Sequence, residues 1–251
     1  MDWSDEGIVL SARRHGEAAA IVTLLTRGHG RHAGLVRGGA GRRQRGIYQI
    51  GNRLNATWRA RLEEHLGSFS CEMMRAYAAE VMSDKLPLVA LSSSAIMLDL
   101  TLPEREPHED IFEGFANLLE ALLTPGWEIT YVRWELELLA ALGFGLDLTS
   151  CAVTGATGDL THVSPRSGRA VSSDAGAAYR DRLLDLPEFL RADSPDAKPR
   201  RNDILTGLAL TGHFLQRFVF APDDRRIPAA RTRLVDGIGK ATTISSHCNA
   251  S

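Results

Sequence analysis

The sequence contains little cysteine and no long apolar run. Its three cysteines, Cys71, Cys151 and Cys248, are an odd number and lie far apart, so they are not the framework of a disulfide-stapled secreted domain. The apolar runs are too short to cross a bilayer, and acidic residues stand where a signal peptide would be basic and then apolar. We therefore expect a cytoplasmic protein with no membrane contact.

Motifs for nucleotide hydrolysis and nucleophilic catalysis are also missing. The chain has no G-x-x-x-x-G-K-[ST] loop, no G-x-G-x-x-G that opens a helix, and no G-x-S-x-G elbow. His15 stands near Glu17 and His29 near His32, but closeness in sequence does not make a catalytic pair, and we expect surface histidines. The sequence thus predicts a protein that is not an enzyme and uses no cofactor or small-molecule substrate.

Charge is unevenly divided along the chain, although the formal net charge is only −2. Residues 1–61 hold eleven arginines, no lysine and four acids, a formal charge of +7, so the remaining residues carry −9. A basic segment joined to an acidic one indicates a polyanionic partner for the basic part. Improved solubility is the other interpretation of the same charges.

Residues 1–79 predict a small β-barrel. Short apolar or alternating runs bounded by turn residues predict strands over 7–12, 20–26, 32–36, 54–60 and 66–72. Five short strands joined by glycine-rich turns fit an OB-fold.

Residues 80–240 predict a helical domain. Apolar residues at helical spacing, with caps and proline or glycine stops, predict helices over 86–100, 111–123, 129–142, 203–219 and 228–235. A segment rich in Gly, Ser and Thr over 150–177 predicts an irregular insert, and we expect 241–251 to be a disordered tail. The expected fold class is α+β, an N-terminal OB-fold barrel followed by an all-helical domain.

The turn over 36–46 is the strongest candidate for a binding site. It holds four arginines interleaved with glycines, namely Arg37, Arg42, Arg43 and Arg45. Glycine lets the backbone approach a ligand, and arginine matches phosphate oxygens and stacks on bases. If their strands share a face, the patch extends to Arg13, Arg14, Arg53, Arg59 and Arg61. The alternative is a mobile basic loop without a ligand.

Three aromatic residues of the same part of the chain are candidate platforms for nucleic-acid bases: Trp3, Tyr48 and Trp58. Each has a second interpretation as core packing, because tryptophan in a small barrel is usually structural.

Cys151 opens the only segment that suggests a metal site. A structural zinc needs four thiolate or imidazole ligands, usually as two close pairs. Thr154, Ser172 and Ala175 stand where further ligands would be needed, and His162 is the only other nearby ligand. The sequence therefore predicts a degenerate zinc-ribbon-like insert that holds no metal.

Arginines accompany apolar residues near the C-terminal end as well. Arg217, Phe218, Arg231 and Arg233 are candidates for an apolar groove rimmed by arginine, which suits an acidic peptide with a terminal aromatic residue. Core helices with solvated charges are the alternative.

Taken in order, these segments resemble the bacterial RecO family over nearly the whole chain. The resemblance is carried by DEGIVL at 5–10, HGE at 15–17, TRGHGR at 26–31, LVRGG at 35–39, LGF at 142–144 and RTRL at 231–234. It departs from the zinc-containing members, because only Cys151 of their four cysteines is present.

The resemblance implies an OB-fold and a helical domain, and a set of DNA-related activities. It implies binding of single- and double-stranded DNA, annealing of complementary strands, partnership with RecR, and contact with the acidic C-terminal tail of single-stranded DNA-binding protein (SSB). The expected outcome is loading of RecA in DNA repair without nucleotide hydrolysis. Arg37, Arg42, Arg43 and Arg45 would contact DNA, and Arg217 and Arg233 would lie at the tail-binding groove. An RNA-binding OB protein and a protein-interaction adaptor that binds no DNA remain as alternatives.

Overall fold

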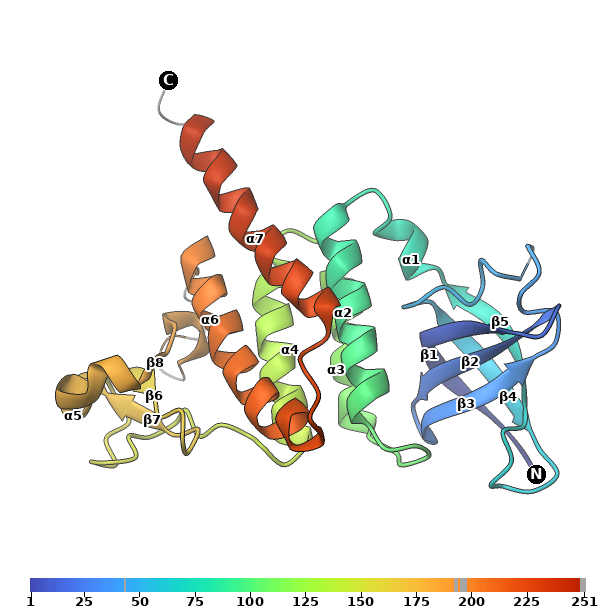
Figure 1. Ribbon diagram of the computed structural model, residues 1–251, viewed down its shortest axis with the longest axis horizontal. Helices are drawn as coiled ribbons and strands as arrows, with labels where there is room; N and C mark the ends of the chain where they lie inside the picture. Colours follow the sequence, from blue (N-terminus) through green and yellow to red (C-terminus); the bar gives the residue numbers. More distant parts are fainter. Residues whose placement is uncertain (43, 192–193, 195–197, 249–251) are drawn as a thin grey trace. The chain divides into compact units, whose positions relative to one another are not determined.

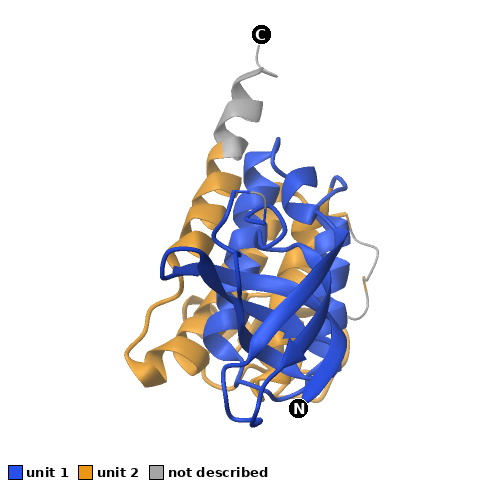
Figure 2. Ribbon diagram, turned by 90° about the vertical axis from the view of Figure 1, so that its right-hand side faces the viewer, with its two compact units in different colours: residues 1–125 blue, residues 126–251 orange. Residues whose placement is uncertain are grey.

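The computed structural model describes residues 1–251 except 43, 192–193, 195–197 and 249–251, and it leaves the side chains of 241–248 undescribed. The described chain forms two compact units, residues 1–125 and 126–251 (Figures 1 and 2). It is a mixed α+β structure in which a five-stranded N-terminal barrel is followed by helices, as the sequence predicts.

The barrel consists of β1 (Asp2–His15), β2 (Ala19–Thr26), β3 (Gly30–Val36), β4 (Arg53–Arg59) and β5 (Ser68–Arg75). The strands close in the order β1-β2-β3-β5-β4, with β4 returning to β1. β1 is longer than the expected 7–12 because its N-terminal half pairs with β4 and its C-terminal half with β2, with a bulge between Val9 and Ser11. Such bulges bend a strand and let one strand serve both sides of a small barrel.

Alternating apolar residues fill the barrel. Val9, Val22, Leu24, Leu54 and Phe69 are among its buried core residues. This inward face explains why short apolar or alternating runs located all five strands.

Three helices complete unit 1: α1 (Tyr77–Glu80), α2 (Lys85–Thr101) and α3 (Glu109–Ala121). α2 packs against β1, and ion pairs join the barrel to both longer helices. Arg27 pairs with Glu113 of α3, and Arg31 pairs with Asp99 of α2. These contacts place the boundary between the compact units at 125/126, whereas the sequence suggests a domain boundary at 79/80.

Unit 2 combines helices with a small sheet. Its helices are α4 (Trp127–Ala141), α5 (Ser173–Gly176), α6 (Arg201–Phe214) and α7 (Ala229–Cys248), and a π-helical turn, η3 (Leu215–Phe220), continues α6. Short 3-10 turns cover η1 (Ala177–Arg182), η2 (Glu188–Leu190) and η4 (Ala221–Asp223). The sheet has the order β7-β6-β8, formed by β6 (Leu160–Val163), β7 (Ala170–Ser172) and β8 (Leu184–Asp185).

Two expectations for unit 2 differ from the structure. The segment 150–177 is not wholly irregular, because β6 and β7 form a hairpin whose turn ends at Gly168 with φ +71°. The last helix, α7, continues past the expected end near Val235 and extends to Cys248. The expectation of a disordered tail over 241–251 stays a prediction. Residues 249–251 lie outside the described part.

One helical stretch, Arg201–Asp223, is long and apolar enough by composition to cross a bilayer. Its apolar side chains, among them Leu208, Phe214, Leu215 and Phe220, are buried. α6 within this stretch packs on α4 and α7, so the stretch has the character of a core helix.

Candidate nucleic-acid interface

The loop between β3 and β4 that carries the arginines, residues 37–46, is held to the barrel at three points and is called the arginine loop below. The Ala40 amide donates to the Ala18 carbonyl of the β1–β2 turn at 3.0 Å. The buried Asn52 side chain donates to the carbonyls of Gly46 and Ile47 at 2.9 and 3.1 Å. Since the amides of Gln44 and Arg45 also bond to the Gly41 carbonyl, the loop is a defined turn.

The arginines of this loop are turned outward. Arg37, Arg42 and Arg45 are exposed, and within the described residues their side chains make no hydrogen bond or ion pair. Arg43 lies outside the described residues. Guanidinium groups with no internal acceptor keep all five of their donors for a ligand, and phosphate oxygens match their forked geometry.

Two more arginines belong to this end of the barrel. The register pairs Arg14 with Ala20, and Ala20 with Val36, so the C-terminal end of β1 lies two strands from the start of the arginine loop. Arg13 is exposed beside it, and Arg14 donates to the Glu17 carbonyl at 2.8 Å. Arg14 therefore lies beside the arginine loop and belongs to one basic surface with it. Arg13, the preceding residue of the strand, instead lines a pocket that also contains Glu64, Asp99 and Glu104.

Arg59 and Arg61 form a second group at the opposite end of β1. Arg59 pairs in register with Asp2, some eleven residues from Arg13, which is roughly 35 Å along a strand. Both side chains are exposed, and Arg59 lies 3.9 Å from the Asp2 carboxylate. The structure thus places the predicted basic residues in two groups and not in one continuous patch.

Three arginines are structural and do not extend the surface. Arg53, expected as part of the patch, binds Glu6, as does Arg27, and Arg31 binds the Leu102 carbonyl at 2.8 Å. The Arg53 guanidinium is the main reason that the pKa of Glu6 lies below its ordinary value. No sequence pattern indicates these pairs, because partners such as Glu113 stand as far as 86 positions from their arginine.

Tyr48 and Trp58 do not fit the expectation of exposed stacking platforms. Tyr48 is 5% exposed and Trp58 1% exposed, and both belong to the barrel core. The Trp58 indole donates to the Leu66 carbonyl at 3.1 Å, so its polar atom is satisfied internally. Core packing, the second interpretation of these residues, describes their placement, whereas Trp3 remains partly exposed.

The segment around Cys151 does not provide the ligands of a zinc ribbon. The thiol sulfur accepts hydrogen bonds from the Ser172 amide and hydroxyl at 3.3 and 3.4 Å. Burial raises the pKa of Cys151, but hydrogen bonds from Ser172 and Thr154 outweigh it and lower the pKa to about 6. Within the described ranges no three His, Cys, Asp or Glu side chains lie close enough to hold a metal. Ser172 thus contacts the sulfur where a second ligand would stand.

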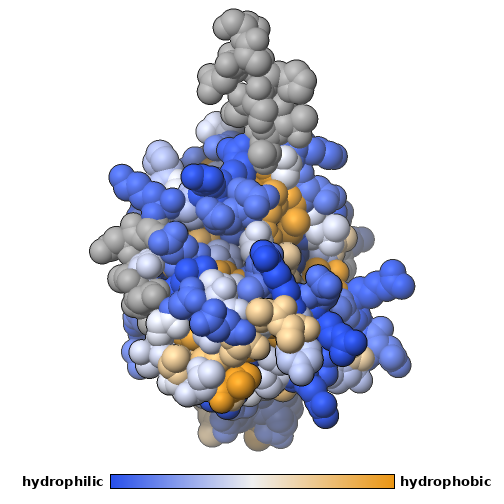
Figure 3. Space-filling view, turned by 90° about the vertical axis from the view of Figure 1, so that its left-hand side faces the viewer, coloured by the Kyte–Doolittle hydropathy of each residue, from blue (hydrophilic) through white to orange (hydrophobic). Residues whose placement is uncertain are grey.

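Some of the arginines expected at the C-terminal groove lie on the surface of unit 2, and one lies in its core. Arg217 is exposed on the π-helical turn, with its guanidinium carbon 5.4 Å from the Phe218 ring centroid, and Phe218 stacks on Phe144 at 5.4 Å. Arg233 is also exposed. The face of the molecule in Figure 3 shows apolar residues in small areas among hydrophilic ones, so the part of unit 2 seen there offers no broad apolar surface.

Arg231, which we expected at the rim of the groove, is buried in the structure. It is 5% exposed, and its guanidinium donates to both oxygens of the buried Glu135 carboxylate at 2.7 and 2.8 Å. It also donates to the Leu208 carbonyl at 2.7 Å, so its donors serve the core of unit 2. Residues two apart on a helix face different directions, which explains why Arg233 is exposed when Arg231 is not.

Comparison with known proteins identifies the family. The profile described as "Recombination protein O N terminal" matches residues 1–77, and "Recombination protein O C terminal" matches residues 84–225. The chain is 54% identical to the DNA repair protein RecO of Rhodospirillum centenum over 98% of each chain. It is 49% identical to the proteins of that name from Cereibacter sphaeroides, over 96% of this chain and 100% of the relative, and from Rhodospirillum rubrum, over 94% and 96%. With an exposed arginine surface on a closed barrel and similarity to these relatives over almost its whole length, the chain belongs to the RecO family of DNA repair proteins.

Proposed function

We propose that this chain is a DNA-binding recombination mediator. It binds single- and double-stranded DNA, anneals complementary strands, and with RecR helps to load RecA onto single strands coated by SSB. It acts in the cytoplasm, at the nucleoid, and by binding without catalysis. The strand order of the closed barrel supports its description as an OB-fold, a fold that binds oligonucleotides.

The observation that carries this proposal is the unpaired state of the arginine loop. Arg37, Arg42 and Arg45 are exposed and have no acidic partner within the described residues, although the chain as a whole has more acids than bases. A fixed turn that presents several free guanidinium groups favours a polyanion of repeating charge.

Annealing requires two polyanionic strands to come together, and the basic surface lowers their repulsion. Each phosphate that an arginine neutralises releases condensed counterions, which adds about 0.9 to the log–log salt slope for duplex and about 0.7 for a single strand. Binding that depends on this surface therefore weakens steeply with salt and depends little on sequence.

The test is a salt titration of labelled DNA by fluorescence anisotropy. Replacing Arg37, Arg42 and Arg45 together by alanine should flatten the slope on duplex by roughly two to three units. The matched control replaces three exposed arginines of unit 2, Arg166, Arg182 and Arg226, and should leave the slope near that of the wild type. An unchanged slope in the loop variant would remove the loop from the interface.

The same assay separates the two alternative functions. An RNA-binding protein would prefer RNA over DNA of the same sequence in competition, through contacts to the 2′-hydroxyl. An adaptor would bind neither nucleic acid, even at low salt.

We further propose that the acidic tail of SSB binds near Arg217, Phe218 and Arg233. The stacked rings of Phe144 and Phe218 beside an exposed guanidinium offer contacts for an aromatic side chain and for a carboxylate. Arg217→Ala should weaken binding of an acidic peptide with a C-terminal aromatic residue in calorimetry, while Arg166→Ala should not. Equal affinity of the two variants would place the tail elsewhere.

A further inference from the structure

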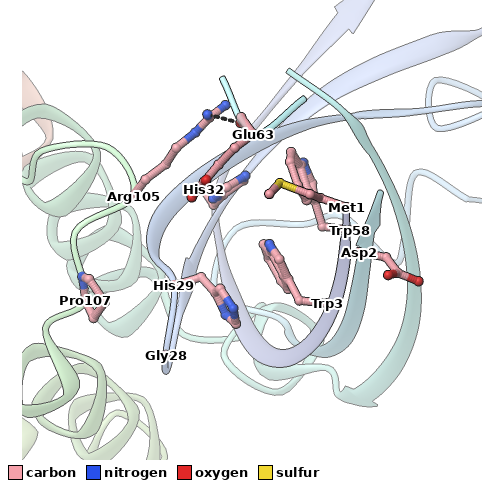
Figure 4. Close-up of a pocket in the computed structure, with 10 residues that line it drawn as sticks. All are labelled: Met1, Asp2, Trp3, Gly28, His29, His32, Trp58, Glu63, Arg105 and Pro107. Atoms are coloured by element: carbon pink, nitrogen blue, oxygen red, sulfur yellow. Dashed lines mark hydrogen bonds between the residues drawn. The ribbon is translucent and has the colours of Figure 1, made fainter. Parts of the chain in front are cut away.

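A pocket of about 410 Å³ lies at the end of the barrel opposite the arginine loop and is called the aromatic pocket below (Figure 4). Its size falls within the range of small-molecule sites. The residues that line it are Met1, Asp2, Trp3, Gly28, His29, His32, Trp58, Glu63, Arg105 and Pro107. All of them belong to unit 1, and the function proposed above uses none of them. Trp3 and Trp58 are the two that the sequence suggested as platforms for bases.

Aromatic and imidazole rings form much of the wall of the aromatic pocket. Trp3 stacks on His29 with centroids 4.1 Å apart and planes 8° apart, and it stacks on Trp58 at 5.7 Å. His29 is the most accessible of these rings, with 38% of its side chain exposed, and the Asp5 carboxylate holds it at 2.9 Å. The wall is therefore preorganised for a flat, aromatic ligand.

His32 is the polar group that such a ligand would meet. It is 3% exposed, it lines the pocket, and neither ring nitrogen makes a hydrogen bond of normal geometry within the described residues. Its ring meets those of Trp3 and Trp58 edge-on, at 84° and 74°. A buried polar group without a partner is rare and costly, which indicates a missing ligand or water.

The backbone at Arg105 is also held in a constrained conformation at the edge of the pocket. Arg105 has φ +62°, which a non-glycine residue adopts only when its surroundings enforce it. Its amide donates to the Arg31 carbonyl at 2.9 Å, and its guanidinium donates to the carbonyls of Glu63 and His65. Arg105 thus joins the β4–β5 loop to the α2–α3 connection at the rim of the pocket.

The charged residues that line the aromatic pocket limit the class of ligand that it can bind. Asp2 and Glu63 line the pocket together with Arg105, which disfavours a free anion. A neutral imidazole presents one donor and one acceptor on diverging sides of its ring, and the edge of an unpaired nucleobase can bond to either one, whereas a phenyl or aliphatic side chain can bond to neither.

We propose that the aromatic pocket takes up one unpaired base of a single-stranded DNA, with its ring against Trp3 and His29 and its polar edge toward His32. The exposed Arg59 and Arg61 lie at this end of the barrel and bind the adjacent phosphates. This inference rests on the proposed function and extends it, because a base that is paired in a duplex cannot enter the pocket. The pocket thus distinguishes single strands from duplex, which the arginine loop cannot do.

The test compares three labelled probes of equal length in fluorescence anisotropy: a single strand of thymidylates, the same strand with abasic sites, and a duplex. The wild-type protein should bind the thymidylate strand at least about fivefold more tightly than the abasic strand, since a stacked base contributes about 1–3 kcal/mol. His32→Phe should lower this ratio, because it removes the polar group that faces the base while the stacking rings of Trp3 and His29 remain, and it should leave duplex binding unchanged. The melting temperature of His32→Phe should change little, because the substitution keeps a buried ring and neither ring nitrogen of His32 makes a hydrogen bond of normal geometry within the described residues.

Two further variants keep the test decisive. His29→Ala removes a partly exposed ring and should reduce the same ratio if His32→Phe disturbs folding. His15→Phe, an exposed histidine at the far end of β1, should leave the ratio unchanged. Equal binding of thymidylate and abasic strands by the wild type, or an unchanged ratio in His32→Phe and His29→Ala, would overturn the pocket proposal while leaving the mediator function intact. No binding of any probe at low salt would instead contradict the mediator function and the pocket together.

Discussion

Eleven arginines precede residue 62, and their contacts divide them into two kinds. Arg27, Arg31 and Arg53 are held by acids or carbonyls of unit 1, whereas Arg37 and the other loop arginines of the described chain have no internal partner. The amino-acid composition does not distinguish these two kinds of arginine. At the scale of the residue, the free guanidinium groups and not the total charge define the proposed DNA-binding surface.

His32 gives a pH-dependent prediction at this scale. Burial, followed by the charge of Arg105 and that of His29, lowers the pKa of His32 to about 4, against a slight opposing effect of the His29 backbone. In the unfolded chain the same group titrates near 6.5. Between these values the unfolded chain binds more protons, so the stability contribution is present above about pH 6.5 and is lost as the pH falls toward about 4.

The expected loss between about pH 7 and about pH 5 is roughly 2 kcal/mol of unfolding free energy. Urea titrations at the two pH values measure it, and His32→Phe should lose less stability than the wild type by about that amount. An identical pH dependence of the two proteins would show that His32 does not titrate abnormally.

Among the elements, the arginine loop depends on one buried side chain. Asn52 is 1% exposed, donates to the carbonyls of Gly46 and Ile47, and accepts from the Ala78 amide at 3.2 Å. It therefore joins the end of the loop to the start of α1. The position of the arginines relative to the barrel follows from these bonds.

Asn52→Ala should destabilise the protein by about 2–3 kcal/mol, because it leaves buried backbone groups without partners. It should also weaken DNA binding, since the loop arginines lose their fixed arrangement. Hydrogen exchange of the amides of Gln44 and Arg45 reports the loop directly, and their protection should fall. Asn55→Ala, an exposed asparagine of β4, is the matched control, and an equal effect of both substitutions would exclude the anchoring role.

The sequence predicted the elements better than the sites. Short apolar or alternating runs located the five strands, and helical spacing located the main helices, because each pattern reports a buried face. The alternation over 54–60 also places Trp58 on the apolar face of its strand, together with Leu54 and Ala56. No pattern shows that Arg231 points inward, since its partner Glu135 stands 96 positions away in the chain. His32 was expected at the surface and is buried, because sequence alone does not show which histidines the barrel end encloses.

For the whole molecule, the basic and acidic parts of the chain have different tasks in the proposed function. Residues 1–61 carry a formal +7 within a chain of net −2, so the proposed DNA contact falls on the barrel and not on the remainder. Residues 62–251 keep the overall charge low, which limits nonspecific condensation of the protein on DNA.

The central claim is that the arginine loop brings two complementary strands together, and annealing measures it most directly. Two complementary strands carrying a donor and an acceptor dye would be mixed with the protein, and the rise in energy transfer followed over time. The wild type should accelerate annealing, and the acceleration should decline steeply with salt, as expected for counterion release. The variant without Arg37, Arg42 and Arg45 should lose most of this acceleration, whereas the variant without Arg166, Arg182 and Arg226 should keep it. Equal annealing by the loop variant and the wild type, or no acceleration by the wild type at low salt, would contradict the claim.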